Sequence, residues 1–144
     1  MVQVLFVCTG NTCRSPMAEA LCEKVGRDRG IQLSCDSAGL SAFPDSPMAE
    51  NGKKVLEALF GIRDFDHRAK AVTREMVEKA DLVVGVTENH RRMLTQIFGH
   101  SEKILSLPSS VGDPFGGDEK TYEKAARAIL EGIEAFADEG ILHD

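Results

Sequence analysis

The chain has 144 residues, which is enough for one domain with a sizeable hydrophobic core. Its 42% hydrophobic and 28% charged residues are ordinary for a soluble globular protein, and no apolar run approaches the roughly 20 residues of a membrane span. The net charge of −6 argues against a general nucleic-acid binder, because phosphate backbones need a basic surface, and an N-terminus without signal-peptide features predicts a cytoplasmic protein.

The first half of the chain predicts a strand, a helix, a second strand and a second helix. The first strand is a nearly continuous apolar run over 2–7, as expected of a strand that is buried on both faces. Ser15 is expected to cap a helix over 16–29, whose first residue is a proline. After a second strand over 31–38, the spacing of apolar residues over 48–60 predicts the second helix.

The second half adds two strands and three helices. Thr73 is expected to cap a short helix that precedes a buried strand over 82–86. Thr87 is expected to cap the next helix, whose inward-facing residues are predicted to be Met93, Leu94, Ile97 and Phe98. A short strand over 104–107 and a long final helix over 119–139 complete the pattern.

This alternation predicts an α/β fold: a single domain over 1–144, with a four-stranded parallel sheet and helices on both faces. In such sheets, ligands bind in the crevice beyond the carboxyl ends of the strands. The segments that follow strands are therefore expected to gather along one edge, and they are 8–15, 39–47, 87–90 and 108–117.

The 8–15 loop joins the first predicted strand to the first predicted helix. Backbone N–H groups at a helix N-terminus, together with the helix dipole, favour a bound oxyanion. Gly10 permits close approach of the backbone, Asn11 tolerates the left-handed conformation that bends a loop, and Arg14 offers a fork of donors suited to phosphate oxygens. The segment therefore predicts a phosphate-binding loop after the first strand.

The same loop carries a nucleophile. Its N–H groups, Arg14 and the helix N-terminus all stabilise a thiolate at Cys8, which is the reactive form of cysteine. Ser15 is expected to hydrogen-bond this thiolate and to help it depart from the phosphorylated intermediate. The leaving group also needs a proton, and Asp113 in the sequence Asp-Pro-Phe-Gly-Gly is the candidate acid, although an ordinary Asp-Pro turn explains that segment equally well.

Residues 7–16 together with Asp113-Pro114 resemble the low-molecular-weight protein tyrosine phosphatases, and the likeness covers essentially the whole chain. The resemblance implies that Cys8 forms a phosphocysteine and that Arg14 binds the phosphoryl oxygens. It also implies that Asp113 acts first as general acid and then as base for hydrolysis. Supporting roles within the loop, and structural roles behind it, are implied for Asn11, Ser15, Ser37-Ala38-Gly39 and His67.

Two positions resemble the protein arginine phosphatase branch of this family. Tyrosine-specific members usually have Ile where this chain has Thr12, and Tyr where it has Phe115. In the arginine branch the smaller Thr is understood to admit the phosphoguanidinium group, which Ile blocks. Such a substrate would also place a cationic leaving group beside Asp113, and Leu40 and Phe115 are expected to contact its stem. The expected substrate-binding residues are Thr9, Gly10, Asn11, Thr12, Cys13, Ser15, Leu40 and Phe115.

The leading prediction is a phosphoprotein phosphatase that acts on phosphoarginine, and three alternatives compete with it. A tyrosine phosphatase would use the same machinery. An arsenate reductase on this scaffold needs further cysteines to resolve the arsenylated thiol, and no cysteine follows Cys35. A non-catalytic phosphate-binding module would have no reason to keep Cys8, Arg14 and Asp113 together.

The cysteines also bear on cofactors and redox chemistry. None of the four has zinc-site spacing, so neither a metal nor another cofactor is predicted. A reducing compartment argues against structural disulfides, but Cys8 and Cys13 lie on one short loop and are expected to be able to form a reversible, regulatory disulfide. The expected partners are phosphorylated protein substrates, with no nucleic acid and no membrane, and the sequence leaves the oligomeric state open.

Overall fold

The computed structural model describes residues 1–109 and 111–143, so residue 110 of the predicted 108–117 loop and residue 144 lie outside the described part. The strands and helices follow one another along the chain with these bounds: β1 Val2–Cys8, α1 Arg14–Arg29, β2 Leu33–Gly39, α2 Glu50–Phe60, α3 Arg74–Lys79, β3 Leu82–Gly85, α4 Glu88–Phe98, β4 Ile104–Ser106 and α5 Glu119–Asp138. Within the described residues, all pairings in the four-stranded sheet are parallel, in the order β2-β1-β3-β4. The predicted α/β fold is confirmed.

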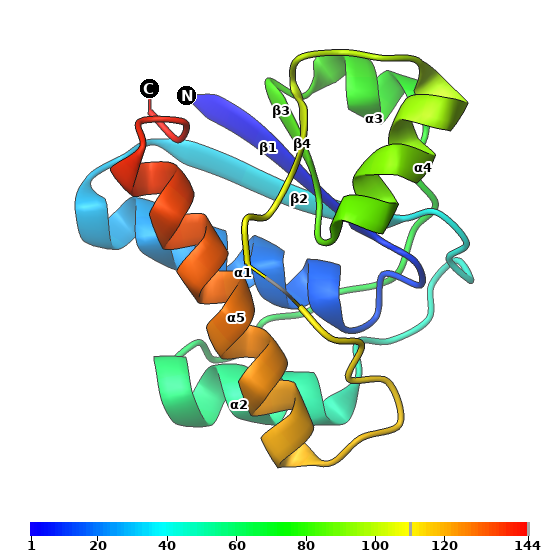
Figure 1. Ribbon diagram of the computed structural model, residues 1–144. Helices are drawn as coiled ribbons and strands as arrows, with labels where there is room; N and C mark the ends of the chain where they lie inside the picture. The colour runs from blue at the N-terminus through cyan, green and yellow to red at the C-terminus, as the bar shows by residue number, and fades with distance from the viewer. Residues whose placement is uncertain (110, 144) are drawn as a thin grey trace.

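β1 lies in the interior of the sheet, and its apolar side chains serve both faces. Val4 and Phe6 pack into one hydrophobic cluster and Leu5 and Val7 into the other, because successive side chains of a strand point to opposite faces. Helices α1, α2 and α5 pack on the first face, and α3 and α4 on the second (Figure 1). The continuous apolar run of the sequence is explained by this burial on both sides.

The first helix begins earlier than the sequence predicts. α1 starts at Arg14, and its N-cap residue is Cys13, which makes no side-chain capping hydrogen bond. The prediction of Ser15 as the cap is wrong, because this residue lies inside the helix. Its Oγ contacts Cys8 Sγ at 2.9 Å and accepts from Asn11 Nδ2 at 2.8 Å, so the hydroxyl serves the preceding loop and not the helix N–H groups.

α4 packs on the sheet with a narrower face than its sequence pattern indicates. Leu94 is fully buried, but Ile97 is 53% exposed, so its predicted inward position is wrong. Met93 and Phe98 are half-buried, and the Phe98 ring lies 5.6 Å from the guanidinium carbon of Arg74. The physical reason is position: α4 contacts β3 and the edge strand β4, so only one stripe of the helix reaches the core.

The two predicted threonine caps are confirmed. Thr73 Oγ1 accepts from Met76 N–H at 3.2 Å at the start of α3, and Thr87 Oγ1 accepts from His90 N–H at 3.3 Å at the start of α4. The second cap is reciprocal, because the His90 side chain accepts from the Thr87 N–H. This capping box fixes the turn that follows β3.

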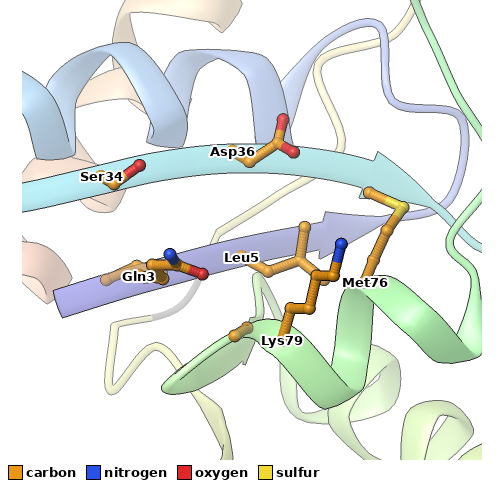
Figure 2. Close-up of a pocket in the computed structure, with 8 residues that line it drawn as sticks. Gln3, Leu5, Ser34, Asp36, Met76 and Lys79 are labelled. Carbon is orange, nitrogen blue, oxygen red and sulfur yellow. The ribbon is translucent and has the colours of Figure 1, made fainter.

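A cavity of about 240 Å³ lies between β1, β2 and α3, and Figure 2 shows its lining. The residues around it include Gln3, Leu5, Ser34, Asp36, Met76 and Lys79. Both labelled charges are paired: Lys79 Nζ lies 2.8 Å from Glu75 Oε1, and Asp36 Oδ1 lies 2.6 Å from Lys70 Nζ. This cavity shares no lining residue with the one that holds the predicted phosphate-binding loop.

Candidate active site

The segments that follow the strands meet at one edge of the sheet, as predicted. Ser41 N–H donates to Thr9 O at 2.9 Å, which fastens the segment after β2 to the loop after β1. Thr9 Oγ1 lies 3.1 Å from Nε2 of His90, which belongs to the first turn after β3. Beyond β4, Val111 O accepts from Arg14 Nη1 at 3.4 Å. The loop after β1 is therefore held from three directions.

A cavity of about 190 Å³ opens at this edge, and its lining holds most of the predicted site residues, namely Cys8, Thr9, Gly10, Asn11, Thr12, Cys13, Arg14, Asp113 and Phe115. Two predicted residues lie outside this lining. Ser15 contacts Cys8 from within α1, and Leu40 is half-buried against the hydrophobic cluster on the α3–α4 face. The contact expected between Leu40 and a substrate stays a prediction.

Cys8 lines the cavity with only 3% of its surface exposed. Its Sγ lies 2.9 Å from Ser15 Oγ, and the same Oγ accepts from Asn11 Nδ2 at 2.8 Å. Because Ser15 accepts from Asn11, its hydroxyl hydrogen is available to the sulfur of Cys8. A hydrogen bond donated to this sulfur stabilises the thiolate more than the thiol.

Asn11 connects the loop to the structure behind it. Its φ of 57° places it in the left-handed region, as the sequence predicts, and it is fully buried. Its Oδ1 accepts from Lys70 N–H at 3.0 Å, and its backbone O lies 2.9 Å from His67 Nε2. Gly39 lets β2 approach this turn, because a Cβ there would lie 2.6 Å from Thr9 O. These contacts offset the conformational cost of the bend.

Arg14 and Asp113 lie close together although they are far apart in the sequence. Arg14 Nη2 lies 3.8 Å from Asp113 Oδ2, with side-chain exposures of 10% for Arg14 and 62% for Asp113. Phe115 N–H donates to Asp113 Oδ1 at 3.1 Å, which orients the carboxyl group. The attraction in an ion pair of this length with one exposed partner is weak, so the Asp113 carboxyl stays accessible to a group bound in the cavity.

Cys13, the second cysteine of the loop, is buried against α5. Its Sγ lies 3.3 Å from Tyr122 Oη and 3.7 Å from Thr12 Oγ1. Both Cys8 and Cys13 are free thiols on one cavity, and the disulfide between them stays a prediction.

Across residues 1–109 and 111–143, no cluster of three His, Cys, Asp or Glu side chains is placed to hold a metal ion. No helix in the described part is long and apolar enough to cross a membrane.

The arrangement of strand, cysteine loop and helix has known counterparts. The profile of the family described as low molecular weight phosphotyrosine protein phosphatase matches residues 3–141. The chain belongs to this family. The resemblance drawn from the Cys8 loop and the Asp113 segment is therefore confirmed.

Relatives of this phosphatase carry two different substrate names. It is 35% identical to a protein-arginine-phosphatase of Bacillus subtilis (strain 168), over 94% of this chain and 95% of the relative. The structure of a YwlE arginine phosphatase mutant with a phosphorylated active-site serine matches with a TM-score of 0.86 and 31% identity, covering 96% of this chain and 95% of that one. A low molecular weight protein tyrosine phosphatase from T. tengcongensis matches with a TM-score of 0.89 and 32% identity, covering 96% and 99%.

Behind its loop, this phosphatase has a mostly buried acid that the sequence pattern did not single out. Glu19 on α1 is 15% exposed, accepts from Ser37 Oγ at 2.7 Å and lies 3.9 Å from His67 Nδ1. Burial raises the pKa of Glu19 to about 7, against the opposing effect of the Ser37 hydrogen bond. Burial lowers the pKa of His67, because it disfavours the charged form of the ring. A signal was present, because Glu19 follows Ser15 at helical i,i+4 spacing and so lies on the same face of α1.

Glu19→Gln is expected to remove a pH dependence of stability. The pKa of Glu19 rises from 4.5 to about 7 on folding, so its stabilising contribution is complete below pH 4.5 and is lost as the pH rises through 7. That shift corresponds to at most roughly 3 kcal/mol in the free energy of unfolding. Urea unfolding at about pH 5 and about pH 7.5 measures the effect, with Glu78→Gln, a change at an exposed residue of α3, as the control. Equal pH slopes for wild type and Glu19→Gln would contradict it.

Proposed function

We propose that this phosphatase hydrolyses phosphoarginine residues in proteins through a phosphocysteine intermediate. The observation that carries the proposal is the composition of one cavity, in which Thr12 lies together with Cys8, Arg14 and Asp113. The last three are the residue types that phosphoryl transfer needs, and Thr12 is a small polar side chain at the position expected to govern substrate choice. The arginine phosphatase of Bacillus subtilis, at 35% identity, supports the same substrate class.

In the first step, the Cys8 thiolate attacks the phosphorus of a phosphoryl group held by loop N–H groups and Arg14. The S–P bond forms as the P–N bond to the guanidino group breaks. Arg14 stabilises the charge that develops on the transferring phosphoryl oxygens. Ser15, whose Oγ lies 2.9 Å from Cys8 Sγ, stabilises the thiolate before attack and again when it leaves. The YwlE mutant that carries phosphate on its active-site serine supports this route.

Asp113 serves as the proton donor and then as the base. Its carboxyl lies 3.8 Å from Arg14 Nη2 and is 62% exposed, so it reaches the group bound by Arg14. In the first step it donates a proton to the leaving guanidine nitrogen. In the second step it takes a proton from the water that attacks the phosphorus of phosphorylated Cys8, and the S–P bond breaks as the new O–P bond forms. Inorganic phosphate leaves and the thiolate is restored.

The substrate preference rests on the cavity wall around Thr12. This side chain is half-buried in the lining and is shorter than the Ile expected in a tyrosine-specific enzyme, which leaves room for a planar phosphoguanidinium group. Asp113 favours a cationic leaving group by charge. Phe115, which is 78% exposed at the same cavity, offers its ring face to that cation.

A protein tyrosine phosphatase with the same machinery is the second candidate. The observation in its favour is the tyrosine phosphatase from T. tengcongensis, which matches this chain at 32% identity, close to the 31% of YwlE. Its leaving group would be a neutral phenol that stacks on Phe115. The two candidates differ in what they require of Thr12, which provides the test.

Thr12→Ile is expected to reverse the substrate preference. Wild type should turn over phosphoarginine protein faster than a matched phosphotyrosine peptide. The substitution should lower kcat/KM for phosphoarginine by roughly 10- to 100-fold, because the extra carbon fills the space of the guanidinium, and should leave phosphotyrosine turnover within a few fold. Steady-state kinetics on both substrates measure this.

Thr12→Val is the matched control for that experiment. It replaces the hydroxyl by a methyl group of nearly the same size, so it separates the size of the side chain from its polarity. If wild type prefers phosphotyrosine and Thr12→Ile changes neither rate, the arginine assignment is wrong and the tyrosine phosphatase stands.

A further inference from the structure

His90 lies next to the candidate site without lining the cavity. It occupies the third position of α4 and is 3% exposed. The start of α4 can approach this closely because β3 ends in Gly85, where a Cβ would lie 2.5 Å from Arg91 N and 3.0 Å from the carbonyl carbon of His90. The fold therefore places this ring against the phosphate-binding loop.

The capping box of α4 determines which ring nitrogen carries the proton. Thr87 N–H donates to His90 Nδ1 at 3.2 Å, and Thr87 Oγ1 lies 3.0 Å from the same nitrogen. Because Nδ1 accepts, the proton of the neutral ring is on Nε2. Burial, together with the charge of Arg14, lowers the pKa of His90 to about 4, against the opposing effect of Asp113. The ring is therefore a neutral Nε2–H donor near neutral pH.

That donor has one partner in the loop. His90 Nε2 lies 3.1 Å from Thr9 Oγ1, so Nε2–H donates to the threonine hydroxyl. Thr9 is the first residue after Cys8, and its carbonyl already accepts from Ser41 N–H at 2.9 Å. The peptide bond between Thr9 and Gly10 is planar and trans, so the Gly10 N–H points in the direction opposite to the Thr9 carbonyl. Thr9 is thus held by its side chain and by its carbonyl, and both bonds restrain the first turn of the loop.

We propose that His90 is a positioning residue for the phosphatase reaction, whose Nε2–H bond to Thr9 Oγ1 preorganises the first turn of the loop for the phosphoryl group. His90 touches neither the nucleophile nor the reacting phosphorus in this role. It acts through Thr9, from an element that lies far along the chain. The inference concerns phosphoryl binding itself, so it holds for either substrate class.

Two substitutions separate this role from helix capping. In His90→Asn the amide oxygen stands where Nδ1 was, so it still accepts from Thr87 N–H, but nothing reaches Thr9. In His90→Gln the amide nitrogen stands where Nε2 was and still donates to Thr9, but the capping acceptor is lost. Each variant is assayed with an aryl phosphate substrate and with inorganic phosphate as competitive inhibitor, and its melting temperature is measured.

The expected result is a split between the two variants. His90→Asn should weaken phosphate inhibition and lower kcat/KM by about five- to tenfold at near wild-type melting temperature, whereas His90→Gln should stay within about twofold of wild type in phosphate affinity and melt lower. The reverse ranking, equal losses in both, or no loss in His90→Asn would overturn the proposal.

Thr9→Val provides an independent test that leaves α4 and its cap intact. It removes the acceptor, so it should weaken phosphate inhibition by about the same factor as His90→Asn. The double variant should be no worse than either single variant, because both remove the same hydrogen bond. Wild-type phosphate affinity in Thr9→Val, or losses that multiply in the double variant, would overturn the proposal.

Discussion

Cys8→Ser is expected to reduce turnover by roughly four orders of magnitude or more while phosphate still binds. A serine hydroxyl is not ionised near neutral pH, so the proposed nucleophile is lost. The anion-binding groups remain, because Arg14 and the loop N–H groups belong to other residues. Steady-state kinetics measure the first effect, and calorimetric titration with inorganic phosphate measures the second. Acid quenching should trap a phosphorylated Cys8 peptide in wild type, whereas any phosphate that the variant acquires at position 8 should stay on the serine without being hydrolysed, as on the serine of the YwlE mutant.

Cys35→Ser is the matched control for that experiment. Cys35 is a half-buried cysteine on β2 and lies outside the lining of the Cys8 cavity, so its replacement should keep the wild-type rate. Retained turnover in Cys8→Ser would show that the covalent route is wrong. Loss of phosphate binding in the same variant would indicate a collapsed loop.

Asp113→Asn is expected to lower kcat by roughly 100- to 1000-fold for substrates with poor leaving groups. The amide keeps the shape of the carboxyl and can still accept from Phe115 N–H, but it can neither donate the proton to the leaving group nor take one from water. The loss should shrink for an activated aryl phosphate whose leaving group needs no proton. Measuring kcat across a series of leaving groups therefore tests the acid role directly.

A control for Asp113→Asn is Asp64→Asn. Asp64 is exposed, lies outside the Cys8 cavity and has a φ of 56°, a conformation that Asn adopts readily. The Asp64→Asn substitution should leave kcat unchanged for every leaving group. If Asp113→Asn lowers kcat equally for good and poor leaving groups, Asp113 is not the general acid.

The fold was predictable because its signals are local and repeated. A strand buried on both faces, such as β1, must be apolar throughout, and Thr73 and Thr87 cap helices with their own side chains. The errors came where a side chain had a choice of partners. Ser15 resembles an N-cap in sequence, but its hydroxyl bonds Cys8 and Asn11. Ile97 follows helical spacing, but the side of α4 on which it lies extends past the edge of the sheet, so its side chain stays exposed.

By itself the sequence predicted the chemistry that we propose for the Cys8 loop. Cys8, Asn11 and Arg14 lie on one short segment between a strand and a helix, so their relative positions follow from local backbone geometry. Asn11 even shows the left-handed φ that its residue type predicts. Together with Asp113-Pro114, this segment carried the family resemblance, which the match over residues 3–141 confirms.

Only the tertiary structure decided what surrounds that loop. The Asp113 carboxyl comes within 3.8 Å of Arg14, Glu19 is buried behind Ser37, and His90 lies 3.1 Å from Thr9. None of these contacts could be assigned from spacing, because each depends on which strands are neighbours and on how closely helices approach the sheet. The order β2-β1-β3-β4 places β1 between β2 and β3. The segments that follow these two strands therefore lie on either side of the loop after β1.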